Sequence, residues 1–248
     1  MTHECEPECY DEAIADEHKE KWLSAMQDEM DSLHENYTYD LVELPKGKRA
    51  LRNKWVYKVK TGEVDNTPRY KARIVVKGFQ QKKGVDFDEI FAPVVKMTSI
   101  QTILGITSSM DLEIEQLDVK TTFLHGEMDE EIYMQQPEGF VEKGKENLVC
   151  RLKKSLYGLK QDPHQWYKQF ESFMLGHGFH RTHVAECVFV KRYDEGDFLI
   201  LLLYVDDMLI VRQHTKRIKI LKKALGKSFA MKDLGPAKQI SRMHIVQD

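Results

Sequence analysis

Two hydrophobic periods occur along the chain, and each predicts a different kind of element. Near the start, apolar residues recur every three or four positions among carboxylates, a spacing typical of an amphipathic helix that packs on a core. Residues 55–60 and 70–77 instead alternate apolar and basic positions, and the turn-forming residues 61–66 between them complete a predicted β-hairpin. The helix face consists of Trp22, Ala25, Met26, Met30 and Leu33.

The rest of the chain interleaves helix and strand patterns without a repeating strand-helix-strand unit. A helix after Pro93 precedes an alternating strand at residues 112–119 that ends near Asp118. Residues 198–211 form an apolar run interrupted by two adjacent aspartates, which favours a hairpin that turns at them. This mixed order of elements predicts the α+β class.

Start and stop signals delimit a further helix at residues 162–176. Asp162 is a favourable N-cap, Pro163 suits the first helical position, and Gly176 is a typical terminator. The apolar face of this helix comprises Trp166, Tyr167, Phe170, Phe173 and Met174. A strand at residues 188–191 follows, and a last helix carries Ile218, Leu221 and Leu225 and stops at Gly226.

The composition is that of a folded protein with a substantial core. The chain has 248 residues, 42% hydrophobic and 31% charged, which suits one large or two small domains and excludes disordered, collagen-like and coiled-coil classes. The longest apolar run, residues 198–205, is far shorter than the ~18 residues of a membrane span, so we expect no membrane partner. An acidic start without an apolar signal segment and four scattered cysteines predict an intracellular protein that is not secreted.

Charge is segregated along the chain although the net charge is only -3. Residues 1–45 contain 14 acidic and 2 basic residues, whereas residues 46–83 contain 13 basic and 2 acidic residues. Residues 84–131 are acidic again, and residues 212–232 form a second basic block without a carboxylate. An acidic middle between basic arms predicts metal ions at the centre and phosphate groups around it.

Three aspartates are candidates for metal binding. Asp206 and Asp207 interrupt an apolar hairpin, where ionised carboxylates are costly unless they are paired or bound to a metal. Taken alone, such a pair is more often an exposed turn, because turns are rich in Asp. Asp118 also ends an apolar strand, and two strand ends from distant parts of the chain could jointly hold hard cations through oxygen ligands.

Several short motifs follow one another in an order that is more specific than any one of them. They are WVYKVK at 55–60, RYKARIVVKGF at 69–79, FAPVVK at 91–96, LDVKTTFLHG at 117–126, EIYMQQPEGF at 131–140, SLYGLKQ at 155–161 with Trp166-Tyr167, and YVDD at 204–207. The series covers nearly the whole chain. It resembles the reverse transcriptase domain of the Pol polyprotein of Ty1/copia-type long-terminal-repeat retrotransposons.

The resemblance implies a right-hand polymerase with fingers, a palm whose antiparallel sheet packs on helices, and part of a thumb. An acidic helical segment would occupy residues 1–45, a fingers-like basic region residues 46–110, the palm residues 111–212, and the start of a thumb or connection residues 213–248. The palm would contain polymerase motif A at residues 117–126, motif B at residues 155–161 with Trp166-Tyr167, and motif C at residues 204–207. Ribonuclease H and integrase segments are expected to be absent, as in a fragment or a degenerate copy. The implied location is the cytoplasm, within a virus-like particle, or the nucleus.

The resemblance also assigns a catalytic chemistry, that of an RNA-directed DNA polymerase. Asp118 and Asp206 would bridge two Mg²⁺ ions, with Mn²⁺ as an alternative, and Asp207 would support them as a third metal and catalytic residue. The expected partners are an RNA or DNA template with its primer and the deoxynucleoside triphosphates. The oligomeric state cannot be deduced from the sequence.

Five further residues are predicted to bind the nucleotide. Lys71 and Arg73 would hold the triphosphate, because Arg offers a bidentate fork to phosphate oxygens and Lys a point charge. Tyr157 and Gly158 should line the nucleotide and template site, and Phe123 should lie beneath the ribose and exclude a 2′-hydroxyl. The alternatives are a solvated edge strand for the two cations, an ordinary turn for the Tyr-Gly pair, and core packing for Phe123.

Two other functions fit parts of the pattern. A non-catalytic retrotransposon remnant would at most bind nucleic acid through residues 46–83, and a metal-dependent nuclease would use the same aspartates but leave motif B without a role. Two departures from the family pattern bear on these alternatives. Ser241-Arg242 stands where Leu-Gly is usual, and Asp162 stands where a small residue is usual.

Overall fold

The structure, a computed structural model, is a mixed α+β protein whose described residues form two compact units. Unit 1 combines Met1–Ile90 with Gly126–Gln165, and unit 2 combines Phe91–His125 with Trp166–Asp248. Each unit is thus built from two separate stretches, whereas the sequence predicts four consecutive regions, whose functional assignment stays a prediction. The residues that the structure describes are 6–61, 67–119, 128, 130–183, 185–193, 196–212, 215–240 and 243–246.

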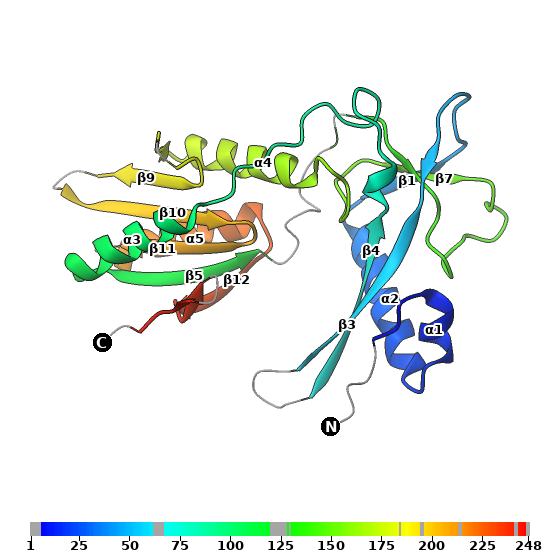
Figure 1. The fold of residues 1–248 in the computed structure, drawn as a ribbon, viewed down its shortest axis with the longest axis horizontal. Coiled ribbons are helices and arrows are strands. Elements are labelled where there is room, and N and C mark those ends of the chain that lie inside the picture. Colours follow the sequence, from blue (N-terminus) through cyan, green and yellow to red (C-terminus); the bar gives the residue numbers. More distant parts are fainter. Residues whose placement is uncertain are drawn as a thin grey trace. The chain divides into compact units, whose positions relative to one another are not determined.

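Unit 1 contains a two-stranded antiparallel ribbon with a helix packed on one of its faces (Figure 1). The elements are α1 (Tyr10–Ala15), α2 (Lys19–Glu35), β3 (Asn53–Thr61) and β4 (Pro68–Val76). The apolar face of α2 is buried as its period predicts, and the Trp22 ring packs edge-on against the rings of Tyr57 and Tyr70. Because side chains alternate along a strand, the ribbon buries its apolar residues against α2 and turns its basic residues to the opposite face.

A second, smaller sheet in unit 1 is not predicted by any pattern in the sequence. Its strands, in spatial order, are β1 (Tyr39–Val42), β7 (Val149–Leu152), β6 (Tyr133–Met134) and β2 (Ala50–Leu51). These strands are too short to show a period, and they come from distant parts of the chain. The short 3₁₀ helix η1 (Gly78–Gln80) follows β4 and leads into the loop at residues 81–90.

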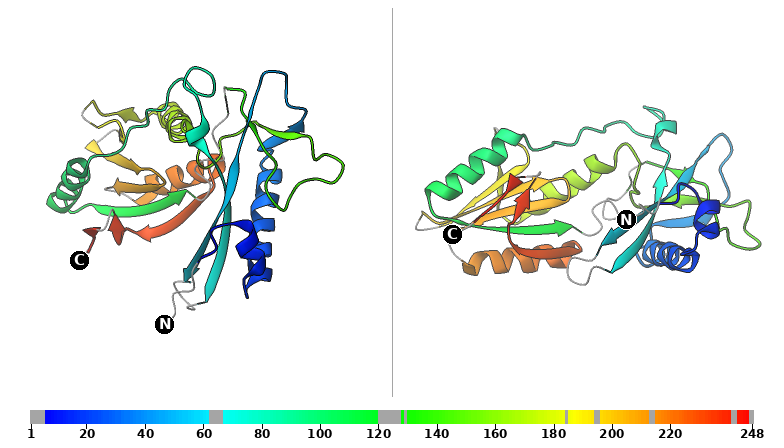
Figure 2. Two further views of the ribbon diagram at one scale, coloured as in Figure 1. Left: turned by 45° about the vertical axis from the view of Figure 1, so that its right-hand side comes forward. Right: turned by 60° about the horizontal axis from the view of Figure 1, so that its bottom comes forward.

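Unit 2 is a six-stranded antiparallel sheet with three helices around it (Figures 1 and 2). The strands, in spatial order, are β12 (Met231–Pro236), β5 (Glu113–Val119), β11 (Asp207–Arg212), β10 (Phe198–Tyr204), β9 (Val188–Arg192) and β8 (His180–Arg181). The helices are α3 (Met97–Ser109), α4 (Asp162–Gly176), whose first residues belong to unit 1, and α5 (Thr215–Ser228). Residues 199–203 and 208–211 are all buried, so the central strands β10 and β11 are covered on both faces.

Most of the elements predicted from the sequence are confirmed. The helix predicted between the cap Asp162 and the terminator Gly176 corresponds to α4, which includes both of these residues, and the predicted hairpin turns at Val205-Asp206. The patterns miss α1, the small sheet of unit 1, the edge strand β12 and the short pair β13 (Gln239–Ile240) and β14 (Met243–His244), all of which are short or largely exposed. Among the helices that the structure describes, none combines the length and the apolar character needed to cross a bilayer.

Candidate active site

The sheet of unit 2 brings two of the predicted metal ligands together. Asp118 lies near the end of β5 and Asp207 begins β11, and the register of these strands pairs the two residues directly. Directly opposed residues of antiparallel strands project to the same face of a sheet. The two carboxylates, both half-buried, therefore share one face although their residues are distant in sequence.

The third carboxylate, Asp206, lies in the turn between β10 and β11 and is exposed. The Asp206 carbonyl accepts a hydrogen bond of 3.0 Å from the N–H of Val119, the residue after Asp118, so the turn is tied to β5. Val205, before Asp206, has a φ of 59°, in the left-handed region. That conformation costs a β-branched residue about 1–3 kcal/mol, and such strain is found most often at functional sites.

The surroundings of Asp207 disfavour the ionised form of its carboxyl group. Burial raises the pKa of Asp207, the hydrogen bond from the Gln116 carboxamide opposes this, and the negative charges of Asp206 and Asp118 raise the pKa further. Gln116 Nε2 donates this bond to Asp207 Oδ1 over 3.2 Å. A cation beside the three carboxylates would relieve their mutual repulsion.

The donor set fits a divalent cation in its chemistry, because carboxylate oxygens are the ligands that Mg²⁺ prefers. Within the described residues, no three or more His, Cys, Asp and Glu side chains form a group that could hold a metal ion. The strand register thus places Asp118 and Asp207 on one face, while the described side chains do not form a finished metal site.

Unit 1 brings the predicted nucleotide residues Arg73 and Tyr157 into contact. The Arg73 guanidinium lies over the Tyr157 ring at 4.7 Å from its centroid, a cation–π arrangement. The Tyr157 carbonyl accepts a hydrogen bond of 2.7 Å from the Val76 N–H, at the end of the strand that carries Lys71 and Arg73. Arg73 and the turn at residues 155–161 therefore contact each other within unit 1, and their common role in nucleotide binding stays a prediction.

Gly158 is required by the packing of this turn. Its φ is +93°, and an added Cβ would lie 2.2 Å from the Val76 carbonyl oxygen. An added Cβ on Gly78 would likewise lie 1.9 Å from the Gly158 carbonyl oxygen. The glycine therefore serves a close approach of two protein backbones, and its predicted place beside the nucleotide stays a prediction.

The ribbon has a strongly basic face opposite α2. Its strand register places Lys58 opposite Lys71 and Lys60 opposite Arg69, and directly opposed like charges destabilise a sheet by roughly 0.2–1 kcal/mol per pair. An anionic ligand such as a phosphate backbone would remove this repulsion. The basic residues of this face are Lys54, Lys58, Lys60, Arg69, Lys71 and Arg73.

One carboxylate of the acidic N-terminal segment lies near the cations of β4. Glu29 of α2 accepts a hydrogen bond of 3.4 Å from the Ile74 N–H on this strand. Burial raises the pKa of Glu29, and the Ile74 N–H and the charges of Arg73 and Lys71 oppose that rise. The predicted acidic segment is therefore a packed part of unit 1 that borders the basic ribbon.

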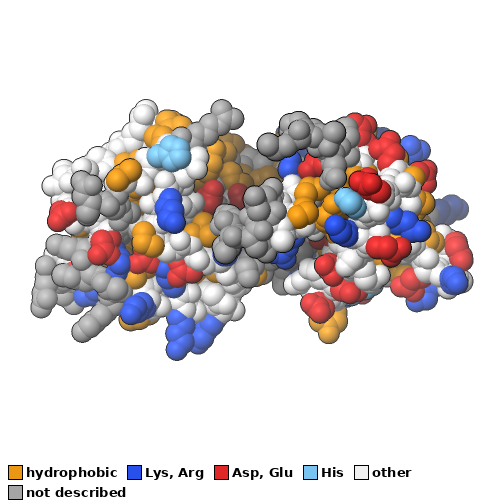
Figure 3. All heavy atoms as spheres, turned by 90° about the horizontal axis from the view of Figure 1, so that it is seen from below, with side chains coloured by type: hydrophobic (Ala, Val, Ile, Leu, Met, Phe, Trp, Pro, Cys, Tyr) orange, Lys and Arg blue, Asp and Glu red, His pale blue; other side chains and the backbone are white. Residues whose placement is uncertain are grey.

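Several cations of the second basic block are neutralised inside unit 2, contrary to the expectation that they face phosphate. Arg212 is only 7% exposed and forms ion pairs with Glu113 and with Glu115, the latter at 2.8 Å. Lys222 pairs with Glu115 and Asp233. On the face drawn in Figure 3, basic side chains (blue) are intermingled with acidic ones (red). The block therefore supplies less free positive charge than its composition suggests.

The remaining sequence features are Phe123 and the two departures from the family pattern. Phe123, which is predicted to exclude a 2′-hydroxyl, lies outside the residues that the structure describes. The departure at Ser241-Arg242 lies outside them as well. The second departure, Asp162, is 3% exposed, and burial, opposed in part by the Ser155 hydroxyl, raises the pKa of its carboxyl group to about 8.

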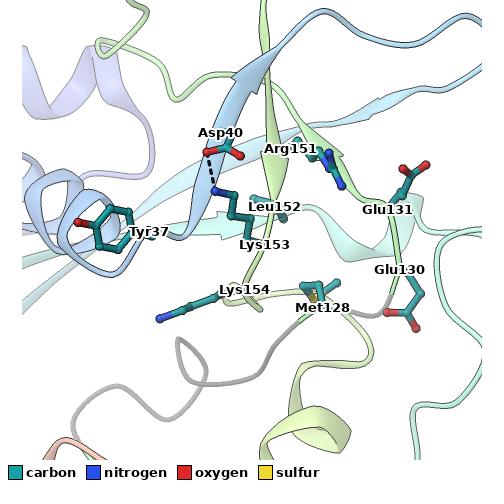
Figure 4. Close-up of a pocket in the computed structure, with 9 residues that line it drawn as sticks. All are labelled: Tyr37, Asp40, Met128, Glu130, Glu131, Arg151, Leu152, Lys153 and Lys154. Carbon is teal, nitrogen blue, oxygen red and sulfur yellow. Dashed lines mark ion pairs between the residues drawn. The ribbon is translucent and has the colours of Figure 1, made fainter.

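A pocket of about 470 Å³ in unit 1 contains none of the predicted site residues (Figure 4). Its lining is of mixed charge, with the Lys153–Asp40 ion pair of 2.8 Å on one side and Glu130 and Glu131 on the other. Because its acids and bases largely offset one another, the pocket has no charge preference that points to a substrate.

Sequence reasoning missed Gln116, which contacts the candidate carboxylates. Gln116 stands two positions before Asp118 on the same strand and is buried on the same face. Its spacing from Asp118 could have identified it, because the period of a strand is two.

Comparison with known proteins shows the family to which the chain belongs. The family of reverse transcriptases (RNA-dependent DNA polymerases) matches residues 36–248, and the chain belongs to it. The resemblance to Ty1/copia elements is confirmed by the relatives that the chain matches.

Two plant proteins and a yeast protein illustrate this relationship. The chain is 60% identical over its whole length to the retrovirus-related Pol polyprotein from transposon TNT 1-94 of Nicotiana tabacum, of which it spans 19%. It is 37% identical over 92% of its length to the corresponding polyprotein from transposon RE2 of Arabidopsis thaliana, of which it spans 16%. It is 28% identical over 90% of its length to the Ty1-LR2 Gag-Pol polyprotein of Saccharomyces cerevisiae, of which it spans 12%.

Proposed function

We propose that the chain is an RNA-directed DNA polymerase domain that extends a primer on an RNA or DNA template with deoxynucleoside triphosphates. The observation that carries the proposal is the pairing of Asp118 with Asp207, with Asp206 in the adjoining turn. A bound cation stabilises carboxylates that are gathered at the ends of apolar strands. Family membership and the basic ribbon support the same function.

We take Asp118 and Asp206 as ligands of two Mg²⁺ or Mn²⁺ ions, with Asp207 in support. Bound there, the ions would lower the pKa of the primer 3′-hydroxyl and stabilise the charge that develops on the triphosphate. The chain itself contributes by positioning the three aspartates. The β5–β11 ladder orients Asp118 and Asp207, and the Val119–Asp206 hydrogen bond holds the turn.

In unit 1, we propose that Lys71 and Arg73 bind the phosphates of the nucleotide. The contact of Arg73 with the Tyr157 ring restricts the guanidinium, so less side-chain entropy is lost when phosphate binds. Tyr157 and Gly158 would line the nucleotide site, and Phe123 would exclude ribonucleotides. In right-hand terms, the six-stranded sheet is the proposed palm and the ribbon belongs to the proposed fingers.

Primer extension with the Asp118→Asn variant tests the proposal. The substitution keeps the size of the side chain but removes a metal-binding charge, so we expect extension to fall at least about 100-fold. The melting temperature should stay level or rise, because Asp118 raises the pKa of Asp207 by repulsion. The matched control is Asp111→Asn, an exposed residue just before β5 with a φ of 51° that Asn tolerates, and it should keep full activity.

The same assay separates the alternatives. A wild-type chain that binds nucleic acid but extends no primer with Mg²⁺ or Mn²⁺ would be a non-catalytic remnant. Cleavage of nucleic acid that disappears in Asp118→Asn, without any extension by the wild type, would identify a nuclease.

A further inference from the structure

The turn that carries Asp206 is strained and partly exposed. Val205 adopts a φ of 59° and its side chain is 43% exposed. A β-branched residue leaves the left-handed region readily unless its surroundings hold it there. Since nearly half of Val205 is exposed, groups that bind the backbone of the turn are needed to help hold this conformation.

Two donors bind consecutive carbonyls of the turn. The Val119 N–H donates to the Asp206 carbonyl, and the indole N–H of Trp166 donates to the Val205 carbonyl, each over 3.0 Å. Trp166 is 3% exposed, and its ring packs against Phe170 at 5.6 Å and Phe229 at 5.3 Å between centroids. The indole donor is therefore held rigidly by the core.

We propose that Trp166 is a positioning residue for Asp206, because its indole N–H holds the Val205–Asp206 turn in one conformation. The kinetic part of this inference rests on the proposed function. Rotation of the peptide between Val205 and Asp206 would break the bond to Trp166 and reorient the Asp206 side chain. Loss of this donor alone should therefore allow the Asp206 carboxylate to occupy several positions while the core stays packed.

The alternative is that the buried indole N–H of Trp166 bonds to the Val205 carbonyl only because this is the nearest acceptor, without any effect on the turn. The chain offers a matched control for it. Trp55 is also 3% exposed, donates its indole N–H to the Glu138 carbonyl over 2.9 Å, and packs against Phe140 at 5.5 Å. Trp55→Phe therefore removes an equivalent bond that is not made to the turn.

The test compares Trp166→Phe with Trp55→Phe in the full chain. We expect both variants to lower the melting temperature by similar amounts. Only Trp166→Phe should reduce kcat for primer extension, by about 10- to 100-fold, with the KM for nucleotide within twofold, because small misplacement of a reacting group is costly. Hydrogen–deuterium exchange of the amides at residues 205–208 should rise at least about tenfold in Trp166→Phe and stay unchanged in Trp55→Phe.

The inference is overturned if Trp166→Phe matches Trp55→Phe in kcat and in exchange at the turn. If Trp166→Phe unfolds, benzothienylalanine at position 166 keeps the shape of the indole without its N–H, and the same exchange comparison decides. If the wild type extends no primer, the proposed function fails, but exchange at the turn still shows whether Trp166 holds it.

Discussion

At the scale of single residues, Asp162 links the buried start of α4 to the pH dependence of stability. Its carboxyl group has an ordinary pKa of 3.8, and burial raises this to about 8 in the folded chain. Between these values the unfolded chain releases the proton while the folded chain keeps it. The free energy of unfolding therefore falls as pH rises from about 4 to 8, and this contribution is level outside that window.

Replacing this residue should remove the slope. Asp162→Asn should raise the free energy of unfolding at pH 8 by roughly a few kcal/mol and change it little at pH 4. Urea unfolding at intervals between pH 4 and 9 measures the effect, with the exposed Asp28→Asn as control. An unchanged pH slope in Asp162→Asn would show that the carboxyl group is not the cause.

Gly158 permits a second prediction at this scale. Gly158→Ala should destabilise the chain by at least about 2 kcal/mol, because it combines a φ of +93° with a Cβ only 2.2 Å from the Val76 oxygen. Gly105→Ala is the control, since its Cβ would meet nothing within 4 Å on α3 and should stabilise the helix by about 0.5–1 kcal/mol. Equal melting temperatures for the two variants would contradict this account.

At the scale of elements, a buried amide network joins the loop after η1 to the motif B turn. Gln81 donates to Gln161 over 2.9 Å and accepts from the Lys160 N–H over 2.8 Å, and Gln161 donates to the Asp86 carbonyl over 3.0 Å. Gln81 is 5% exposed and Gln161 is fully buried. Because every bond crosses between two loops, the network fixes the turn that presents Tyr157 and Gly158.

Breaking the network should affect the proposed nucleotide site. Gln81→Leu leaves the Lys160 N–H and the Gln161 oxygen unpaired, at a cost of about 1–3 kcal/mol, and should raise the KM for nucleotide about fivefold or more. Gln136→Leu is the control, because Gln136 likewise bonds to backbone groups, at Lys145, Leu148 and Glu142, but away from this turn. It should lower stability without changing KM; a parallel rise in KM would show that the effect is only global.

At the scale of the whole molecule, the positions of the basic residues and of their ion pairs should determine how salt weakens nucleic-acid binding. The ribbon displays its cations on one face, whereas Arg212 and Lys222 of the second block are paired with carboxylates. The logarithm of the binding constant should fall linearly with the logarithm of salt concentration. Residues 46–83 should therefore account for more of this slope than residues 212–232.

Substitutions on the ribbon test this assignment. Lys58→Gln with Lys71→Gln should reduce the salt slope by about one unit for each phosphate group that the protein no longer neutralises. Lys145→Gln, which removes an exposed cation that pairs with Glu142, should leave the slope unchanged. If the salt slope does not respond to these substitutions, the basic residues of the ribbon are only solvated and do not bind phosphate.

The sequence alone determined the elements with a clear period and the identity of the candidate chemistry. The helix face around Trp22, the basic hairpin and the carboxylates Asp118, Asp206 and Asp207 are all readable, because periodicity and residue type are local properties. The small sheet of unit 1 and the edge strand β12 were not, since a few residues contain no period and their pairing depends on distant segments.

Tertiary structure alone decided which partner each polar group has. Arg212 counts as a free cation in the sequence but is paired within unit 2, and Gly158 is needed because two backbones of unit 1 meet there. Asp118 and Asp207 lie face to face only through the register of β5 and β11, and the indole of Trp166 reaches the turn only because α4 packs on the same core. Hydrogen bonds and ion pairs act over a few ångströms, so residues far apart in the chain become partners only once the fold has set the distance between them.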